Sequence, residues 1–141
     1  MSRASKKPYL TKSRLTAGLH CPKRLWLNWY EPMPYEDPPP GSVLAVGTEV
    51  GERAWEVFPG GVCIDEPPWA HKEAVAQTAS LIESGDVPAI FEAAFEHDGV
   101  RIRADVLQRK DNGAWALHEV KSTTRVKDAH IHDLAVQVHV I

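Results

Sequence analysis

Cysteines and long hydrophobic runs are scarce in this sequence of 141 residues. Cys21 and Cys63 have no paired spacing, so we expect reduced thiols and no disulfide framework. No apolar run approaches the ~20 residues of a membrane-spanning helix, and the initial MSRASKKPYLTKSR lacks the apolar segment of a secretory signal. These absences predict a soluble, cytoplasmic protein with no membrane partner.

Internal repeats and low-complexity tracts are also missing, apart from the stretch EPMPYEDPPPG at residues 31–41. Its five prolines exclude regular structure and mark a surface connection. With 43% hydrophobic and 25% charged residues, the chain is long enough for one compact core and too short for two. We therefore predict a basic N-terminal helical arm with this loop, residues 1–41, followed by a core at residues 42–141.

Acidic residues are absent from residues 1–30, which hold seven basic residues, although the whole chain has a net charge of −3. This asymmetry makes the arm a candidate phosphate-contacting surface, while the remainder of the chain is too acidic for that role. The alternative explanation is a solvated tail. The candidate nucleic-acid contacts in the arm are Lys12, Arg14, Lys23 and Arg24.

Hydrophobic periodicity predicts helices on both sides of a group of strands. The expected helices begin at Thr11 or Ser13, at Pro22, at Ser42 and near Ala70, and a last helix is capped by Asp128. After a short strand VCI, three strands joined by HDG and KDNG turns are expected at Ala89–Glu96, Val100–Gln108 and Ala114–Lys121. The order predicts an α/β fold with a mixed sheet. The apolar last helix would need more sheet to cover it, so we expect the chain to stop inside its domain.

The loop between the last two predicted strands decides which side chains meet. A two-residue Asn112-Gly113 turn would pair Asp105 with Val120, and Asn-Gly on its own favours this turn. A three-residue loop with a left-handed Gly113 would instead set Asp105 opposite Glu119, and Arg103 opposite Lys121. We predict the longer loop, because it places the two carboxylates side by side.

Adjacent carboxylates on a half-buried sheet repel each other and cost several kcal/mol to desolvate unless a cation lies between them. Mg²⁺ or Mn²⁺ would remove this cost, because hard divalent ions prefer oxygen ligands. Lys121, two residues after Glu119, would add a positive charge beside the metal. The alternative is an exposed cross-strand ion pair worth only ~0.2–1 kcal/mol.

Three segments, RADVL, HEVKSTT and DLAVQ, resemble the second, third and fourth motifs of the PD-(D/E)XK nuclease superfamily in its RecB-like branch. The segment SRLTAGLHCPKRLWL is similar to the N-terminal motif of RecB-like exonucleases that carry an iron–sulfur cluster, including CRISPR-associated ones. The resemblance extends from Leu10 to Ile141 and implies a restriction-endonuclease-like core.

The resemblance also implies roles for single residues. Asp105, Glu119 and the carbonyl oxygen of Val120 would bind Mg²⁺ or Mn²⁺, and Lys121 would be the catalytic lysine. Gln137 matches the helix glutamine that positions the lysine and substrate, and Glu92 matches a supporting acid on the preceding strand. Cys21 fits the first ligand of a 4Fe–4S cluster whose other three cysteines are absent from these residues.

The sequence departs from the family pattern at three positions. Ala104 replaces the motif proline, a variation that the superfamily often shows. Gly51 stands where many RecB-like relatives have a metal-binding histidine, a loss for which Glu49 or Glu52 is a candidate replacement. Ile141 stands in place of a tyrosine after the glutamine motif.

The remaining aromatic, histidine and cysteine residues have simpler explanations. Trp26, Trp29 and Tyr30 could stack on unpaired bases, but aromatic residues at helical spacing more often lie in the core. We expect Trp26 in the core and leave both possibilities open for Trp29. Cys63 is expected in the core. For Cys21 two possibilities stay open, a ligand of the cluster or a small buried residue. His118 is expected on the face opposite Glu119. The remaining histidines near the end, His130, His132 and His139, match no zinc spacing.

The resemblance therefore implies a metal-dependent DNA nuclease, an exonuclease on single-stranded DNA in repair, recombination or defence. The alternative from another class is a nucleic-acid-binding or scaffold module that keeps the fold without cleaving.

Overall fold

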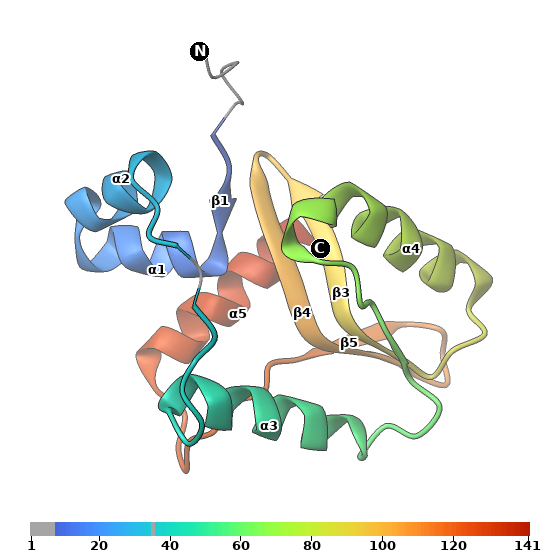
Figure 1. The fold of residues 1–141 in the computed structure, drawn as a ribbon. Coiled ribbons are helices and arrows are strands. Elements are labelled where there is room, and N and C mark those ends of the chain that lie inside the picture. Colours follow the sequence, from blue (N-terminus) through green and yellow to red (C-terminus); the bar gives the residue numbers. More distant parts are fainter. Residues whose placement is uncertain (1–7, 35) are drawn as a thin grey trace.

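The computed structural model describes residues 8–34 and 36–141, which form one mixed sheet flanked by helices (Figure 1). The helices are α1 (Lys12–His20), α2 (Pro22–Tyr30), α3 (Val43–Trp55), α4 (His71–Ser84), α5 (Asp128–Val140) and the short 3-10 helix η1 (Pro68–Ala70). The strands are β1 (Leu10–Thr11), β2 (Val62–Cys63), β3 (Ala89–His97), β4 (Val100–Arg109) and β5 (Trp115–His118). The predicted α/β class and mixed sheet are confirmed.

Side-chain caps fix where two of the predicted helices begin. Thr11 Oγ1 accepts a hydrogen bond from the Arg14 N–H at the start of α1, and Ser42 Oγ accepts one from the Ala45 N–H at the start of α3. The predicted cap at Asp128 is wrong. Lys127 is the cap residue of α5, and its N–H donates to His130 Nδ1. Asp128 is already in the first turn of the helix, where its negative charge interacts favourably with the helix dipole.

Strand β4 is the centre of the sheet. One edge of β4 pairs antiparallel with β3, and the other edge is shared by β1, parallel to its start, and β5, antiparallel to its end. Strand β2 extends the sheet beyond β3 in a parallel direction. Helix α4 packs on one side of this sheet and α5 on the other (Figure 1). Residues 10–20 of the predicted arm thus supply a strand of the sheet and a helix that packs on α5.

The β4–β5 hairpin has the predicted three-residue loop. The Lys110 N–H donates to the Ala114 carbonyl oxygen at 2.8 Å, and Gly113 has a φ of +80°, which glycine adopts without strain. The pairs Val106↔His118 and Leu107↔Leu117 fix a register whose continuation sets Asp105 beside Glu119.

Strand β5 is shorter than predicted at its C-terminal end. It ends at His118 rather than Lys121, so the expected pairing of Arg103 with Lys121 is not made. The reason is a side-chain acceptor. The Val120 N–H donates to Asp105 Oδ2 at 2.7 Å instead of continuing the main-chain ladder.

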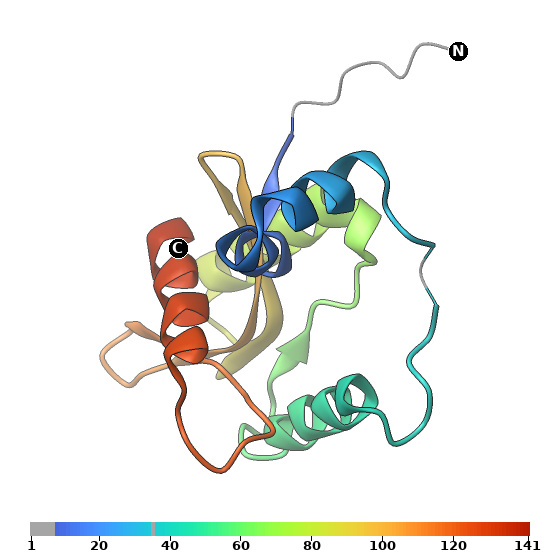
Figure 2. The same cartoon turned by 90° about the vertical axis from the view of Figure 1, so that its left-hand side faces the viewer.

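The core lies between the sheet and its covering elements. One buried cluster joins Ala74 of α4 to Ile90, Ala94 and Leu107 of the sheet. A second cluster forms around Phe91, on which Trp55 at the end of α3 stacks with ring centroids 5.1 Å apart. Helix α3 thus meets the sheet through its C-terminal end, after the long connection from α2 that Figure 2 shows.

Several large apolar side chains of the helices are exposed. Trp26, expected in the core, is half exposed and stacks on Tyr30 of its own helix at a ring distance of 4.9 Å. This prediction is wrong because α2 packs chiefly against α1 and buries none of its residues. Apolar side chains of two other helices are also exposed, Val43 on α3 and Ile131 and Val138 on α5. Within the described ranges, no helix is long and apolar enough to cross a membrane.

Candidate active site

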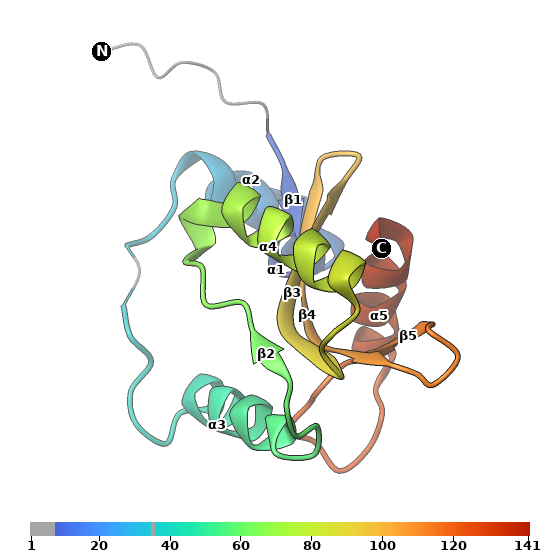
Figure 3. The same ribbon diagram turned by 90° about the vertical axis from the view of Figure 1, so that its right-hand side faces the viewer.

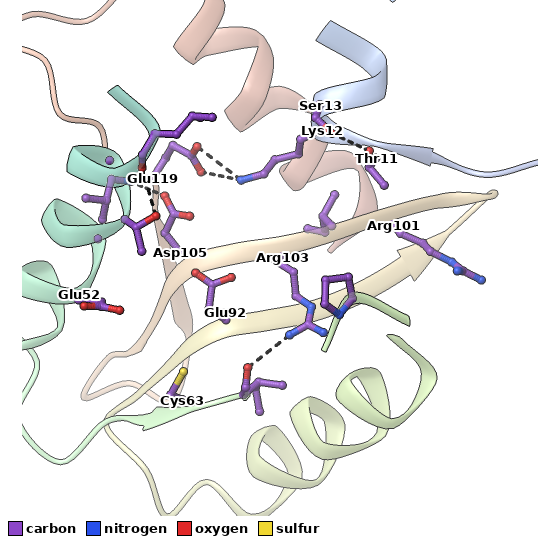
Figure 4. Close-up of a pocket in the computed structure, with 18 of the residues that line it drawn as sticks. Thr11, Lys12, Ser13, Glu52, Cys63, Glu92, Arg101, Arg103, Asp105 and Glu119 are labelled. Carbon is purple, nitrogen blue, oxygen red and sulfur yellow. Dashed lines mark hydrogen bonds and ion pairs between the residues drawn. The ribbon is translucent and has the colours of Figure 1, made fainter. Parts of the chain in front are cut away.

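Three acidic residues lie in a row across three neighbouring strands or strand ends. Asp105 is on β4, Glu92 is at the matching position of β3 between the pairs Phe91↔Val106 and Ala93↔Ala104, and Glu119 directly follows β5. All three line one cleft of about 920 Å³ (Figure 4). The sequence-predicted carboxylates are therefore brought together, with Asp105 in the middle.

Glu92 has a strained main chain. Its φ is +56°, a backbone angle that residues other than glycine, asparagine and aspartate rarely adopt. The ladder between β3 and β4 skips Glu92 and Asp105, while the same register continues on both sides. Strain of this kind costs of order 1–3 kcal/mol and is common at functional sites, where the surrounding structure enforces it.

Glu119 is held by groups from three directions. Gln137 of α5 donates from Nε2 to Glu119 Oε2 at 2.6 Å, and Lys121 Nζ lies 2.8 Å from Oε1. Lys12, the first residue of α1, places Nζ 3.2 Å from Oε2 (Figure 4). These donors favour the charged form of Glu119 and lower its pKa, although burial acts in the opposite direction.

Lys121 is fixed by two carboxylates. Its Nζ lies 2.8 Å from Glu119 Oε1 and 2.8 Å from Asp133 Oδ2 on α5. Burial alone would lower the pKa of Lys121, but the hydrogen bonds to Asp133 and Glu119 outweigh it and raise the pKa. Lys121 therefore stays protonated at neutral pH and can act as a positive charge, not as a general base.

Asp105 and Glu92 differ from Glu119, because their surroundings raise the pKa of each carboxyl group. Burial raises the pKa of Asp105, and the charge of Glu119 raises it further, although Lys12 opposes both effects. Burial and the Asp105 charge likewise raise the pKa of Glu92. Both groups are thus short of compensating positive charge, and a cation between them would remove this repulsion.

The donor set fits a hard divalent ion that is held partly by water or substrate. Within residues 8–34 and 36–141, no group of three or more His, Cys, Asp or Glu side chains is arranged to hold a metal ion. Mg²⁺, however, commonly binds through one or two carboxylates and completes its shell with water and phosphate oxygens. Asp105 and Glu119 supply two such carboxylates, and Val120, whose carbonyl oxygen is the third predicted ligand, lines the same cleft.

Replacing Glu92 by glutamine is expected to stabilise the fold at neutral pH by about 1 kcal/mol, or roughly 3–5 °C in Tm. Because folding raises the pKa of Glu92, the unaltered protein loses stability as the pH rises from the usual value of 4.5 through the raised one. Glutamine does not titrate, so the difference should vanish below pH 4.5. Thermal denaturation followed by circular dichroism measures it.

Glu83→Gln is the matched control for this experiment, because Glu83 is exposed on α4 and its substitution should leave the Tm unchanged. Equal melting temperatures of the Glu92→Gln variant and the unaltered protein at pH 7 would show that Glu92 carries no electrostatic cost.

Helix α3 faces the acidic row across the cleft. Gly51 and Glu52 line the cleft, and a Cβ atom on Gly51 would meet no atom within 4 Å. Of the two candidate replacements for the missing histidine, Glu52 lies at the cleft (Figure 4), whereas Glu49 pairs with Arg53 at 2.9 Å on the surface.

The predicted nucleic-acid contacts separate into two groups. Lys12 reaches Glu119 inside the cleft, and Arg14 packs against the rings of Tyr9 and Trp29. Lys23 and Arg24 are exposed on α2.

The two cysteines lie in different surroundings. Cys21 is exposed between α1 and α2, so its alternative placement in the core is wrong. Cys63 is partly buried and packs on the cluster around Phe91, in keeping with its predicted place. Since the sequence holds only these two cysteines, it cannot supply the four ligands of such a cluster by itself.

Two contacts of the acidic row were missed from the sequence. The position of Lys12 beside Glu119 depends on the pairing of β1 with β4, which no local pattern reveals. Asp133, in contrast, lies four residues before Gln137 on the same face of α5, so the two side chains reach the same segment of the chain, Asp133 at Lys121 and Gln137 at Glu119.

No family model, curated protein or solved structure matches the chain. What the site can do is therefore argued from its own residues.

Proposed function

We propose that this chain is a metal-dependent nuclease of the RecB-like PD-(D/E)XK type, with a restriction-endonuclease-like core, that hydrolyses single-stranded DNA. The observation that carries the proposal is that Asp105 on β4 lies beside Glu119, which directly follows β5. Lys121 and Gln137 both contact Glu119. These are the residues that the three nuclease-like sequence motifs single out, and they meet although up to 32 positions separate them.

In this proposal Asp105, Glu119 and the Val120 carbonyl oxygen would hold Mg²⁺ or Mn²⁺. The bound ion would lower the pKa of a water molecule and neutralise charge on the scissile phosphate. Lys121, kept protonated by Glu119 and Asp133, stabilises the negative charge that develops on the phosphate. Gln137 holds Glu119 in place through its 2.6 Å hydrogen bond.

The proposal predicts release of nucleotides from single-stranded DNA by the protein in Mn²⁺ or Mg²⁺, and loss of this activity when EDTA removes the metal. A fluorescently labelled oligonucleotide separated on a denaturing gel measures the products, and RNA and duplex DNA of the same sequence test the substrate class. Activity that persists in EDTA would contradict the metal-dependent mechanism.

The second candidate function is a nucleic-acid-binding module without catalysis. Its supporting observation is that Lys12 already places a positive charge beside Glu119, while Gly51 supplies no ligand from α3. This alternative predicts DNA binding that weakens with salt, is indifferent to divalent metal and is not followed by cleavage. The same assay distinguishes the two candidates.

A further inference from the structure

A cluster of two arginines and two aromatic residues lies at the start of β4, the strand that carries Asp105 of the acidic row. We call Tyr9, Arg14, Trp29 and Arg101 the Tyr9 cluster. The Arg101 guanidinium carbon lies 4.0 Å from the centre of the Tyr9 ring, and that of Arg14 lies 4.7 Å from the same ring and 4.5 Å from the Trp29 ring. The two rings meet edge to face, with centroids 5.3 Å apart. Ring contacts of this kind hold the guanidinium groups without cancelling their charge.

The pairing of β1 with β4 builds this cluster. Thr11 is the partner of Arg101, and the Leu10 N–H donates to the Gly99 carbonyl oxygen at 2.8 Å. Tyr9, directly before β1, is thereby carried to the start of β4 beside Arg101. The Arg14 side chain donates in turn to the Tyr9 carbonyl oxygen, which ties α1 to the same point.

Much of the positive charge around this end of the cleft is not neutralised. In the part of the chain that the structure describes, no carboxylate forms an ion pair with Arg14 or Arg103. Arg103 donates to the main-chain oxygens of Ile64 and Glu66, which are neutral acceptors. Arg101 uses Nε for Glu96, so its terminal nitrogens keep further donors.

The positive charges and the acidic row belong to one cleft and one strand. Tyr9, Arg101, Arg103 and Asp105 all line the cleft, and the last three alternate along β4 (Figure 4). At ~3.3 Å per residue, Arg101 stands about 13 Å from Asp105 along the strand, with Arg103 halfway. A strand that carries arginines along the cleft up to the acidic row suits a polyanion that enters over the arginines and ends at the acids.

We propose that the Tyr9 cluster and Arg103 bind the sugar–phosphate backbone of the nucleic-acid strand whose scissile phosphate reaches the acidic row. Arg101 and Arg103 contact phosphates, and Tyr9 positions the Arg101 guanidinium. This inference rests on the proposed function for what happens at Asp105, but the binding itself needs no hydrolysis. Figure 3 shows β1, which Tyr9 directly precedes, alongside β4 at the end of the sheet away from α3.

The test is binding of a short fluorescein-labelled oligothymidylate, measured by fluorescence anisotropy in Ca²⁺ in place of Mg²⁺. Arg101→Gln is expected to weaken binding about tenfold, because it removes a charge-assisted contact. It should also reduce the slope of log affinity against log salt concentration by about 0.7, the value for one phosphate contact on a single strand. Arg53→Gln removes a surface arginine of α3 that does not line the cleft, and should change neither quantity.

Two variants of Tyr9 test whether its aromatic ring positions the Arg101 guanidinium. Tyr9→Leu should weaken binding several-fold, whereas Tyr9→Phe keeps the ring and should bind like the unaltered protein.

The outcomes distinguish this inference from the proposed function. Equal affinity and equal salt slope for the Arg101→Gln and Arg53→Gln variants would overturn the inference, even if the protein cleaves DNA. Weaker binding by Arg101→Gln alone would support it, even if the unaltered protein does not cleave DNA, in which case only the proposed function fails.

Discussion

Replacing Asp105 by asparagine is expected to reduce metal-dependent cleavage of single-stranded DNA by about 10³-fold or more. Asp105 is the middle carboxylate of the acidic row, and the amide that replaces it carries no charge to hold a divalent ion. Loss of the metal removes several kcal/mol of transition-state stabilisation, and each 1.36 kcal/mol is a factor of ten in rate. Initial rates in Mn²⁺, with the concentration of folded protein checked by circular dichroism, give this ratio.

The Asp105→Asn variant should fold, because the amide oxygen can still accept the hydrogen bond from the Val120 N–H. The control is Asp86→Asn, a substitution at an exposed acid between α4 and β3 that should leave the rate unchanged. Equal rates for Asp105→Asn and the unaltered protein would remove Asp105 from the active site.

Replacing Lys121 by methionine is expected to lower the rate by about 10²–10³-fold, the usual effect of removing one group that stabilises transition-state charge. The side chain is held against Glu119 and Asp133, so the lost charge is a fixed one. Because the pKa of Lys121 is raised, the rate of the unaltered protein should show no fall near neutral pH from loss of this proton. Rates of both proteins between pH 6 and pH 9 measure the effect.

Lys121→Arg tests whether charge alone is sufficient. Arginine keeps the positive charge but not the compact ammonium that fits between two carboxylates, so partial recovery of the rate is expected. Lys72→Met, at an exposed position on α4, is the control that should not change the rate. A Lys121→Met variant as fast as the Lys72→Met control would show that Lys121 has no part in catalysis.

The centre of the candidate site could be predicted because its geometry follows from a short loop. The loop at Asp111–Gly113 fixes the hairpin register, and the register alone decides whether Asp105 and Glu119 meet. Periodicity was likewise sufficient for the helices and for β3 and β4, whose apolar runs are long.

The surroundings of the site were harder to predict because they depend on contacts between distant segments. Lys12 reaches Glu119 across 107 positions, and Tyr9 reaches Arg101 through the pairing of β1 with β4. The positive φ of Glu92 could not be expected either, because glutamate has no local preference for it. The exposure of Trp26 follows from how little α2 packs against the sheet, which helical spacing alone cannot indicate.

The claim that Asp105 and Glu119 hold a divalent ion can be tested by titrating the metal-free protein with Mn²⁺ in a calorimeter. We predict one site in the unaltered protein, with an affinity that rises with pH, because ion binding must displace the proton that the raised pKa of Asp105 favours. The Asp105→Asn variant should lack this site, and Asp86→Asn should retain it. The same Mn²⁺ affinity in the Asp105→Asn variant and the unaltered protein would contradict the claim.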